Sequence, residues 1–385
     1  MTTTNEPDVV VTDVNKIKTK TYGNAGKIAV IGAFPTSTKQ IGAYTKLEDA
    51  QADFGASPIP AGCVSYDCLP YLFNQDSQSK GAEEVIIVNT NYGASSLSYT
   101  ITNELLADAL LVLSDEDFDI LTIADTINLE ATGSNDSVIV NPLWNTLKGF
   151  VDSQYRNQQP FGIITSISID KTSTTGDATL ASFKQLFHDK GIYKIVTTPA
   201  HISTDVNALS LAQSGCWHAA FTAGRAVNKS ETGKFYKALK GVDSKSEFPI
   251  SSTSGVIDWE NLLDAGLHTT KYHNRRLQEL KCINNKTPAG WDMKVERVKN
   301  YIVKRLQFTD IFGEDNNEPT LDMVKGLFKY EKELALKANY VTDMDYEITH
   351  CSSECVRAKL FLEIPEVVRH VKMEVSVEIT PYEEA

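Results

Sequence analysis

The chain contains 385 residues, and its 42% of hydrophobic and 23% of charged residues are typical of a globular protein with a substantial core. This length exceeds that of one ordinary domain and favours two domains. Its 37 basic and 50 acidic residues give a net charge of −13, which disfavours a general nucleic-acid binder, because such a protein needs a basic footprint.

The start of the chain, MTTTNEPDVVV, lacks the basic and apolar regions of a signal peptide. No apolar run approaches the roughly 18 residues of a membrane span, so we expect no direct membrane insertion. Synthesis in a reducing bacterial cytoplasm, with all six cysteines as free thiols, is the expectation from these features.

The first part of the chain predicts a polar arm followed by alternating strands and helices. Residues 1–22 form the arm, with a short strand around Val9, Val10 and Val11. The run KIAVIGAFP, residues 27–35, predicts a buried strand and turn. A short helix over 46–55 should end at Gly55, and a second buried strand is expected over 85–88.

The same alternation continues along the middle of the chain. Helices are predicted over 104–113, 143–157 and 178–191, and strands over 118–123, 161–169 and 193–199. Strands that alternate with helices predict an α/β layer with a mainly parallel sheet. We assign residues 23–267 to this outer α/β domain.

The pattern changes after residue 267. Two amphipathic helices are predicted over 291–313 and 319–339, followed by antiparallel strands over 340–349 and 356–364. These elements and the N-terminal arm predict an inner α+β domain over 268–385.

The chain ends in a further strand pattern, in which apolar and polar residues alternate. The apolar residues of this pattern are Val371, Met373, Val375, Val377 and Ile379. A terminal strand with one buried face needs a partner, which lies either in the same subunit or in another copy.

No residue pattern predicts a reaction. The segment Gly23 to Lys27 precedes its strand and lacks the hydroxyl residue of a phosphate-binding loop. There is no G-x-S-x-G nucleophile turn. The segment HCSSEC, with His350, Cys351 and Cys355, fits a turn with free thiols better than half of a zinc site, although the metal alternative stays open. We therefore expect no catalytic residues, no cofactor and no enzyme activity.

Several ordered segments resemble the contractile tail sheath proteins of bacteriophages, tailocins and contractile injection systems. They are KIAVIGAFPTS with IGAYTKLEDAQADFG, then YLFNQDSQSKGAEEVIIVNT, then HAAFTAGRAVNKSETGKFYKALKGV, and lastly the two helices and final strands. The resemblance covers most of the chain, although HNRRL departs from the commonest G-x-RT form after Asn274. It implies that the strands around Val9 to Val11 and over 371–379 are arms that complete the sheets of neighbouring subunits.

The helix over 319–339 carries a basic stripe. Lys325, Lys329 and Lys332 follow each other at i, i+4 and i+7, away from a core stripe. The members of the core stripe are Val324, Leu327, Phe328 and Leu334. The lysines are an ordinary solvated face or, as the resemblance implies, the face that contacts an acidic inner tube.

The resemblance implies a structural sheath protomer that polymerises around an inner tube and contracts to drive the tube through a target envelope. Its expected partners are other copies in stacked hexameric rings, the tube protein, and baseplate and terminator proteins, with no nucleic acid. The assembled particle would be a virion tail or a released particle. The alternatives are a cytoplasmic α/β enzyme with a C-terminal accessory domain, or another structural subunit of such a particle.

Overall fold

The computed structural model describes eighteen parts of the chain. They are residues 26–60, 63–73, 81–126, 130–131, 138–139, 142–156, 159–167, 195–199, 220, 223, 235–236, 259–264, 266–267, 269–273, 276–281, 293–306, 318–352 and 355–364. Among these residues, no helix is both long enough and apolar enough to cross a membrane.

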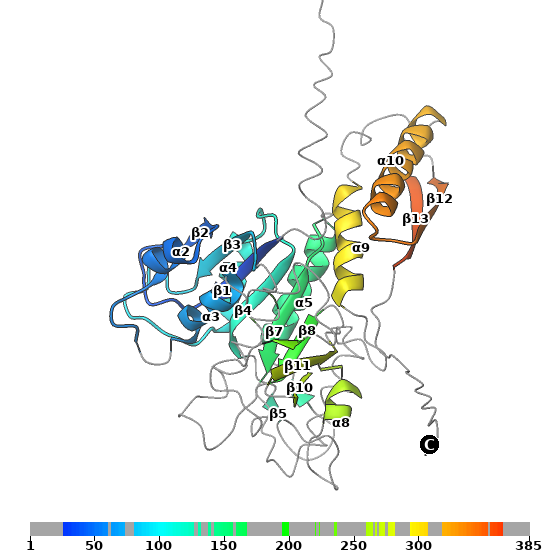
Figure 1. The fold of residues 1–385 in the computed structure, drawn as a ribbon. Coiled ribbons are helices and arrows are strands. Elements are labelled where there is room, and N and C mark those ends of the chain that lie inside the picture. Colours follow the sequence, from blue (N-terminus) through cyan, green and yellow to red (C-terminus); the bar gives the residue numbers. More distant parts are fainter. Residues whose placement is uncertain are drawn as a thin grey trace, which may run out of the picture.

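A six-stranded sheet is the largest layer of the described chain (Figure 1). Its strand order is β2-β3-β1-β4-β7-β8. The strands are β1 (Lys27–Gly32), β2 (Ile41–Tyr44), β3 (Glu84–Asn89), β4 (Ile120–Thr126), β7 (Gly162–Ile167) and β8 (Ile195–Pro199). All neighbours are parallel except β2, which runs antiparallel to β3. The prediction of a mainly parallel sheet is confirmed for these strands.

Helices bury both faces of this sheet, which explains why its strands are almost continuously apolar. In β1, Ile28 and Val30 join one core, whereas Ala29 and Ile31 join the other. The covering helices are α2 (Leu47–Phe54) and α3 (Val64–Phe73) on the first face, and α4 (Asn103–Val112) and α5 (Pro142–Arg156) on the second. The flanking helices predicted over 46–55, 104–113 and 143–157 are therefore confirmed.

A separate hydrophobic core holds the C-terminal elements together. They are α9 (Met293–Arg305), α10 (Glu318–Lys337), β12 (Asp343–Ser352) and β13 (Cys355–Glu363). β12 and β13 form an antiparallel hairpin, and α10 lies along one face of it (Figure 1). Both predicted helices and both predicted antiparallel strands are confirmed, although α9 ends at Arg305 and residues 307–313 of the predicted helix lie outside the described residues. The division of the chain at residue 267 stays a prediction.

The end of α10 has a local explanation in the sequence. Asn339 has a left-handed φ of 57°, a conformation that asparagine tolerates better than most residues. The Tyr340 amide donates to the carbonyl of Ala335, and the Asn339 amide donates to that of Leu336. This is the hydrogen-bond pattern of a Schellman motif, which turns the chain from α10 into β12.

Several elements were not predicted. The edge strand β2 and the helix α3, which contains Pro70, have short and weakly periodic sequences. Gly55 ends α2 as predicted, but its backbone is extended, and a side chain there would lie 2.4 Å from the Gln51 carbonyl oxygen. β4 begins at Ile120 rather than Phe118, because Asp117 and Asp119 belong to the turn before it.

Smaller elements complete the described chain. They are β5 (Glu130–Ala131), β6 (Val138–Ile139), β9 (Phe235–Tyr236), α8 (Trp259–Asp264), β10 (Thr269–His273) and β11 (Arg276–Lys281). β11 pairs with both β10 and β9, so this sheet joins segments from the two sides of the predicted domain boundary. The helix predicted over 178–191 lies outside the described residues.

Candidate interaction surfaces

The residues predicted to form the inter-subunit arms all lie outside the described residues. They are Val9, Val10, Val11, Val371, Met373, Val375, Val377 and Ile379. Their pairing therefore stays a prediction, and the surfaces that can be built from contacts are those of α10, the hairpin and the turn before β4.

The three lysines predicted to face a tube lie on one side of α10. Lys325 and Lys329 are exposed, and Lys332 is partly exposed. Lys325 pairs with Asp322 at 2.9 Å, and Lys332 pairs with Asp343 of β12 at 3.2 Å. Such exposed pairs contribute only about 0–1 kcal/mol each and are screened by salt. Lys329 makes no ion pair with the described part of the chain.

The opposite side of α10 is built into the C-terminal core. Val324 and Phe328 are buried as predicted, whereas Leu327 and Leu334 are only partly buried. Arg305 of α9 makes a bidentate pair with the buried Glu331, from Nε to Oε2 at 2.7 Å and from Nη2 to Oε1 at 2.9 Å. The hydrogen bond to Glu331 raises the pKa of Arg305, so the guanidinium stays charged. This charged pair holds α9 against α10.

The hairpin has one buried and one exposed face. Tyr346, Ile348, Leu360 and Leu362 pack into the C-terminal core, together with the fully buried Met344. The residues that alternate with them are exposed on the other face: Asp345, Glu347, Thr349, Lys359, Phe361 and Glu363. Among the described residues, β12 and β13 pair only with each other, so each strand leaves one edge open for another strand.

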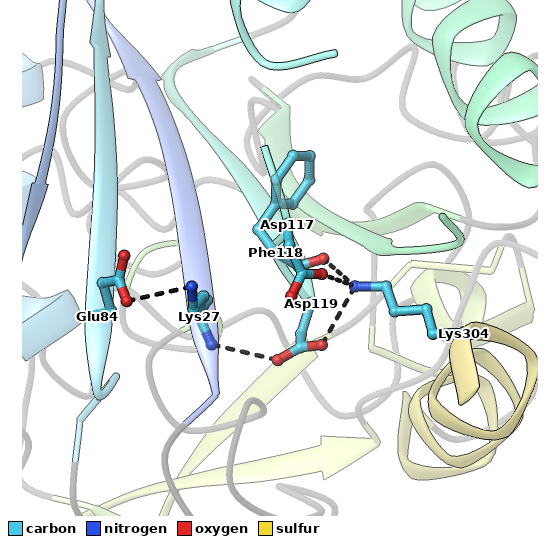
Figure 2. Close-up of polar contacts among 6 residues, drawn as sticks. All are labelled: Lys27, Glu84, Asp117, Phe118, Asp119 and Lys304. Atoms are coloured by element: carbon cyan, nitrogen blue, oxygen red, sulfur yellow. Dashed lines mark hydrogen bonds and ion pairs between the residues drawn. The ribbon is translucent and has the colours of Figure 1, made fainter. Parts of the chain in front are cut away.

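A single lysine connects α9 to the six-stranded sheet (Figure 2). The Lys304 side chain is 14% exposed and donates to the Phe118 carbonyl at 2.6 Å. It also pairs with Asp117 at 3.0 Å and with Asp119 at 3.4 Å. Asp119 in turn accepts from the backbone amide of Lys27 in β1 at 3.2 Å. This contact therefore ties the last turn of α9 to the amino ends of two central strands.

Asn89 and Asn91 are buried in the loops at the carboxyl end of the sheet, and the Asn89 side chain holds these loops together. Oδ1 of Asn89 accepts from the amides of Phe34 and Asn91, both at 3.0 Å. Its Nδ2 donates to the carbonyls of Thr36 at 2.7 Å and Lys39 at 3.2 Å. All four hydrogen-bonding positions of this amide are used to hold the chain, so it is a structural group rather than a ligand site.

The described residues contain no group of three or more His, Cys, Asp or Glu side chains that could hold a metal ion. His350 and Cys351 lie near the end of β12 and Cys355 begins β13, but their side chains are outside the described ones. The hairpin places these residues at its turn, as predicted. Cys63 and Cys68 are buried and form no disulfide, and burial raises the pKa of the Cys63 thiol to about 11. Such a thiol is a poor nucleophile.

Comparisons with known proteins identify the fold. No protein-family model and no curated protein sequence matches the chain. Among solved structures, a chain in the sixfold-symmetrised cryo-EM structure of the anti-feeding prophage baseplate is similar over 93% of this chain and 94% of its own, with 10% identity and a TM-score of 0.56.

Two further structures agree with this result. A chain in the contracted anti-feeding prophage baseplate matches over 98% of this chain and 95% of its own, with 13% identity and a TM-score of 0.54. The crystal structure of the sheath tail protein Lin1278 from Listeria innocua matches over 89% and 96%, with 12% identity and a TM-score of 0.51. The chain therefore has a contractile tail sheath-like fold, and the resemblance predicted from its sequence motifs is confirmed at the level of the fold.

Proposed function

We propose that this chain is a sheath protomer of a contractile tail or injection particle, which polymerises around an inner tube and contracts to drive it through a target envelope. The similarity in fold to a sheath tail protein over nearly the whole of both chains carries this proposal. The proposal covers assembly in a bacterial cytoplasm into stacked hexameric rings, and release within a virion tail or a related particle.

Subunits would be joined through strand addition at the hairpin. β12 and β13 each leave an edge open in the described chain, and added strands gain main-chain hydrogen bonds at such edges. The alternating segment over 371–379 and the strand around Val9 to Val11 are the proposed donors, from neighbouring copies. Connections through such exchanged strands would let subunits rotate past each other without separating.

The lysine side of α10 is the proposed tube contact. Lys329 is the lysine of the three that has no acidic partner in the described chain, so it is available for an acidic tube. Because exposed ion pairs are weak, a repeated array of them would hold the tube and release it on contraction. The Lys329→Glu, Lys332→Glu variant should lose tube-templated assembly, and unchanged assembly of that variant would refute the tube contact.

Electron microscopy of the purified protein tests the main proposal. Long hollow tubes or rings support a sheath, whereas uniform small particles at all concentrations refute it. Deletion of residues 1–14 or 371–385 should abolish polymers and leave a folded monomer, as judged by circular dichroism. Unimpaired polymerisation of both truncated proteins would refute the arms.

A second candidate is another structural subunit of the same kind of particle, because two of the matched structures are baseplates. Such a subunit would bind the baseplate in defined copy number and would not form long tubes alone. A cytoplasmic enzyme is the remaining alternative, and no described residue cluster favours it.

A further inference from the structure

The exposed side of α10 contains a shallow notch at Gly326. Gly326 lies two residues from both Val324 and Phe328, and two residues turn a helix by about 200°, so it faces away from the core. Met323 and Tyr330, one turn before it and one turn after it, are 50% and 47% exposed. Two large apolar side chains therefore border a site with no side chain of its own.

No contact within the described part of the chain explains this glycine. A Cβ built at position 326 would meet no atom within 4 Å, and the backbone there is ordinary helix. A glycine inside a helix destabilises it relative to alanine, because it loses more backbone entropy on folding. Glycine in a helix face is useful where another surface approaches the backbone closely.

The opposite side of the same layer presents a protruding side chain. Phe361 of β13 is 55% exposed, because it alternates with Leu360 and Leu362, which pack towards α10. Asp345 lies directly across from it on β12. The exposed charged residues of this face are Asp345, Glu347, Glu363 and Lys359, and Asp343 lies at its edge, where it pairs with Lys332 of α10.

Ion pairs within the subunit offset part of this negative charge, because Asp343 pairs with Lys332 at 3.2 Å and Glu347 pairs with Lys359 at 3.1 Å. Asp345 and Glu363, the two acidic residues nearest to Phe361, make no ion pair with the described part of the chain. Near the notch, Lys329 lies three residues beyond Gly326, and the exposed Glu333 lies seven residues beyond it. Lys337 lies seven residues beyond Tyr330, on the side of the notch. Phe361 is therefore flanked by the carboxylates of Asp345 and Glu363, and the notch is flanked by two lysines and one carboxylate, so the charges of the two sites are partly complementary.

We propose that Phe361 of one copy packs against Gly326 of the next copy, between Met323 and Tyr330, with the acidic residues of the hairpin beside Lys337. The two surfaces lie on opposite sides of the α10–hairpin layer, so each copy offers one surface and receives the other. A head-to-tail contact of this kind generates a ring or a helix rather than a closed dimer. The inference rests on the proposed function, since it assigns a lateral contact within that polymer.

The Gly326→Ala substitution separates this contact from folding. Because the new methyl meets nothing in the subunit, the variant should unfold at a temperature higher by about 2 °C. The same methyl fills the notch, so the critical concentration for assembly, measured by sedimentation, should rise at least roughly tenfold. Gly149→Ala in α5 is the matched control, because a methyl there also meets no atom. It should raise the unfolding temperature and leave assembly unchanged.

Phe361→Ala should weaken assembly to a similar degree, whereas Leu111→Ala, at a side chain 73% exposed on α4, should not. If the two residues contact each other, the critical concentration of the Gly326→Ala, Phe361→Ala double variant should be no higher than that of the single variant that assembles less well. Additive effects of the two substitutions would overturn the pairing.

The outcome for the wild-type protein distinguishes this contact from the proposed function. If the wild-type protein polymerises and Gly326→Ala polymerises at the same critical concentration, the contact is refuted and the sheath proposal stands. A wild-type protein that stays monomeric at every concentration refutes both.

Discussion

Replacing Lys304 with methionine tests the connection between α9 and the six-stranded sheet. The substitution keeps most of the apolar stem and removes the ammonium that the Phe118 carbonyl, Asp117 and Asp119 share. Loss of a charged hydrogen bond to a partly buried carbonyl costs about 1.5–3 kcal/mol. The carboxylates of Asp117 and Asp119 are 58% and 39% exposed, so each pair adds only about 0–1 kcal/mol. We therefore expect a total loss of about 1.5–5 kcal/mol, most of it from the hydrogen bond to the Phe118 carbonyl.

Thermal unfolding and hydrogen exchange together measure this loss. For a protein of this size, we expect the unfolding temperature to fall by roughly 5 °C at low salt. The difference from wild type should shrink in 1 M NaCl, where the Debye length is about 3 Å and the two exposed pairs are screened. Amides of α9 and of the turn before β4 should exchange faster, because both lose their common contact.

Lys148→Met provides the control for a lysine that pairs within one helix. Lys148 pairs with Asp152 at 2.5 Å, four residues along α5, and both side chains are about a third exposed. Its loss should cost only about 0.3–0.5 kcal/mol. If Lys304→Met is no more destabilising than Lys148→Met, the reasoning about the Phe118 carbonyl is wrong.

Three further predictions follow from the described contacts. Asn89→Ala should destabilise the protein by about 3 kcal/mol in urea unfolding, because it leaves four hydrogen-bonding groups of the loops without their partner; a loss under 1 kcal/mol would contradict this role. Arg305→Lys should cost about 1–2 kcal/mol, since lysine cannot reproduce the bidentate pair with Glu331, and an unchanged unfolding temperature would argue against it. Cys63 should resist alkylation at pH 8 in the native protein and react in denaturant, because burial raises its pKa from 9.0 to about 11. Equal alkylation rates in the native and denatured protein would refute this prediction. Since the folded state holds the thiol proton more tightly, the contribution of the Cys63 thiol to the free energy of unfolding is present below pH 9 and is lost as the pH rises through 11.

The elements predicted correctly are those with a strong periodic pattern. β1 and β3 are runs of apolar residues bounded by glycine, asparagine or charge, and they are buried on both faces. α5 and α10 have apolar stripes at helical spacing over 15 and 20 residues, respectively. β2 was missed because a four-residue edge strand, IGAY, has no period of its own and depends on pairing with β3.

The contacts of the exposed residues were harder to predict from the sequence than the helices and strands. The spacing of Lys325, Lys329 and Lys332 correctly placed them away from the core. However, the spacing could not show that Lys332 pairs with Asp343 from the next strand. The notch at Gly326 had a sequence signal, a glycine inside a strong helix pattern, but only the tertiary structure shows that a Cβ at this position would meet no atom of the described chain.

The sequence by itself determined the alternation of strands and helices, the change of pattern after residue 267 and the order of motifs that indicated a sheath-like fold. These features are local, because each depends on the spacing of apolar residues or on a turn residue within one segment. Only the tertiary structure decided the strand order, the contact of Lys304 with the turn before β4, and the opposite placement of Gly326 and Phe361. Such contacts join residues far apart in the chain, and packing between elements, rather than local periodicity, determines which of them meet.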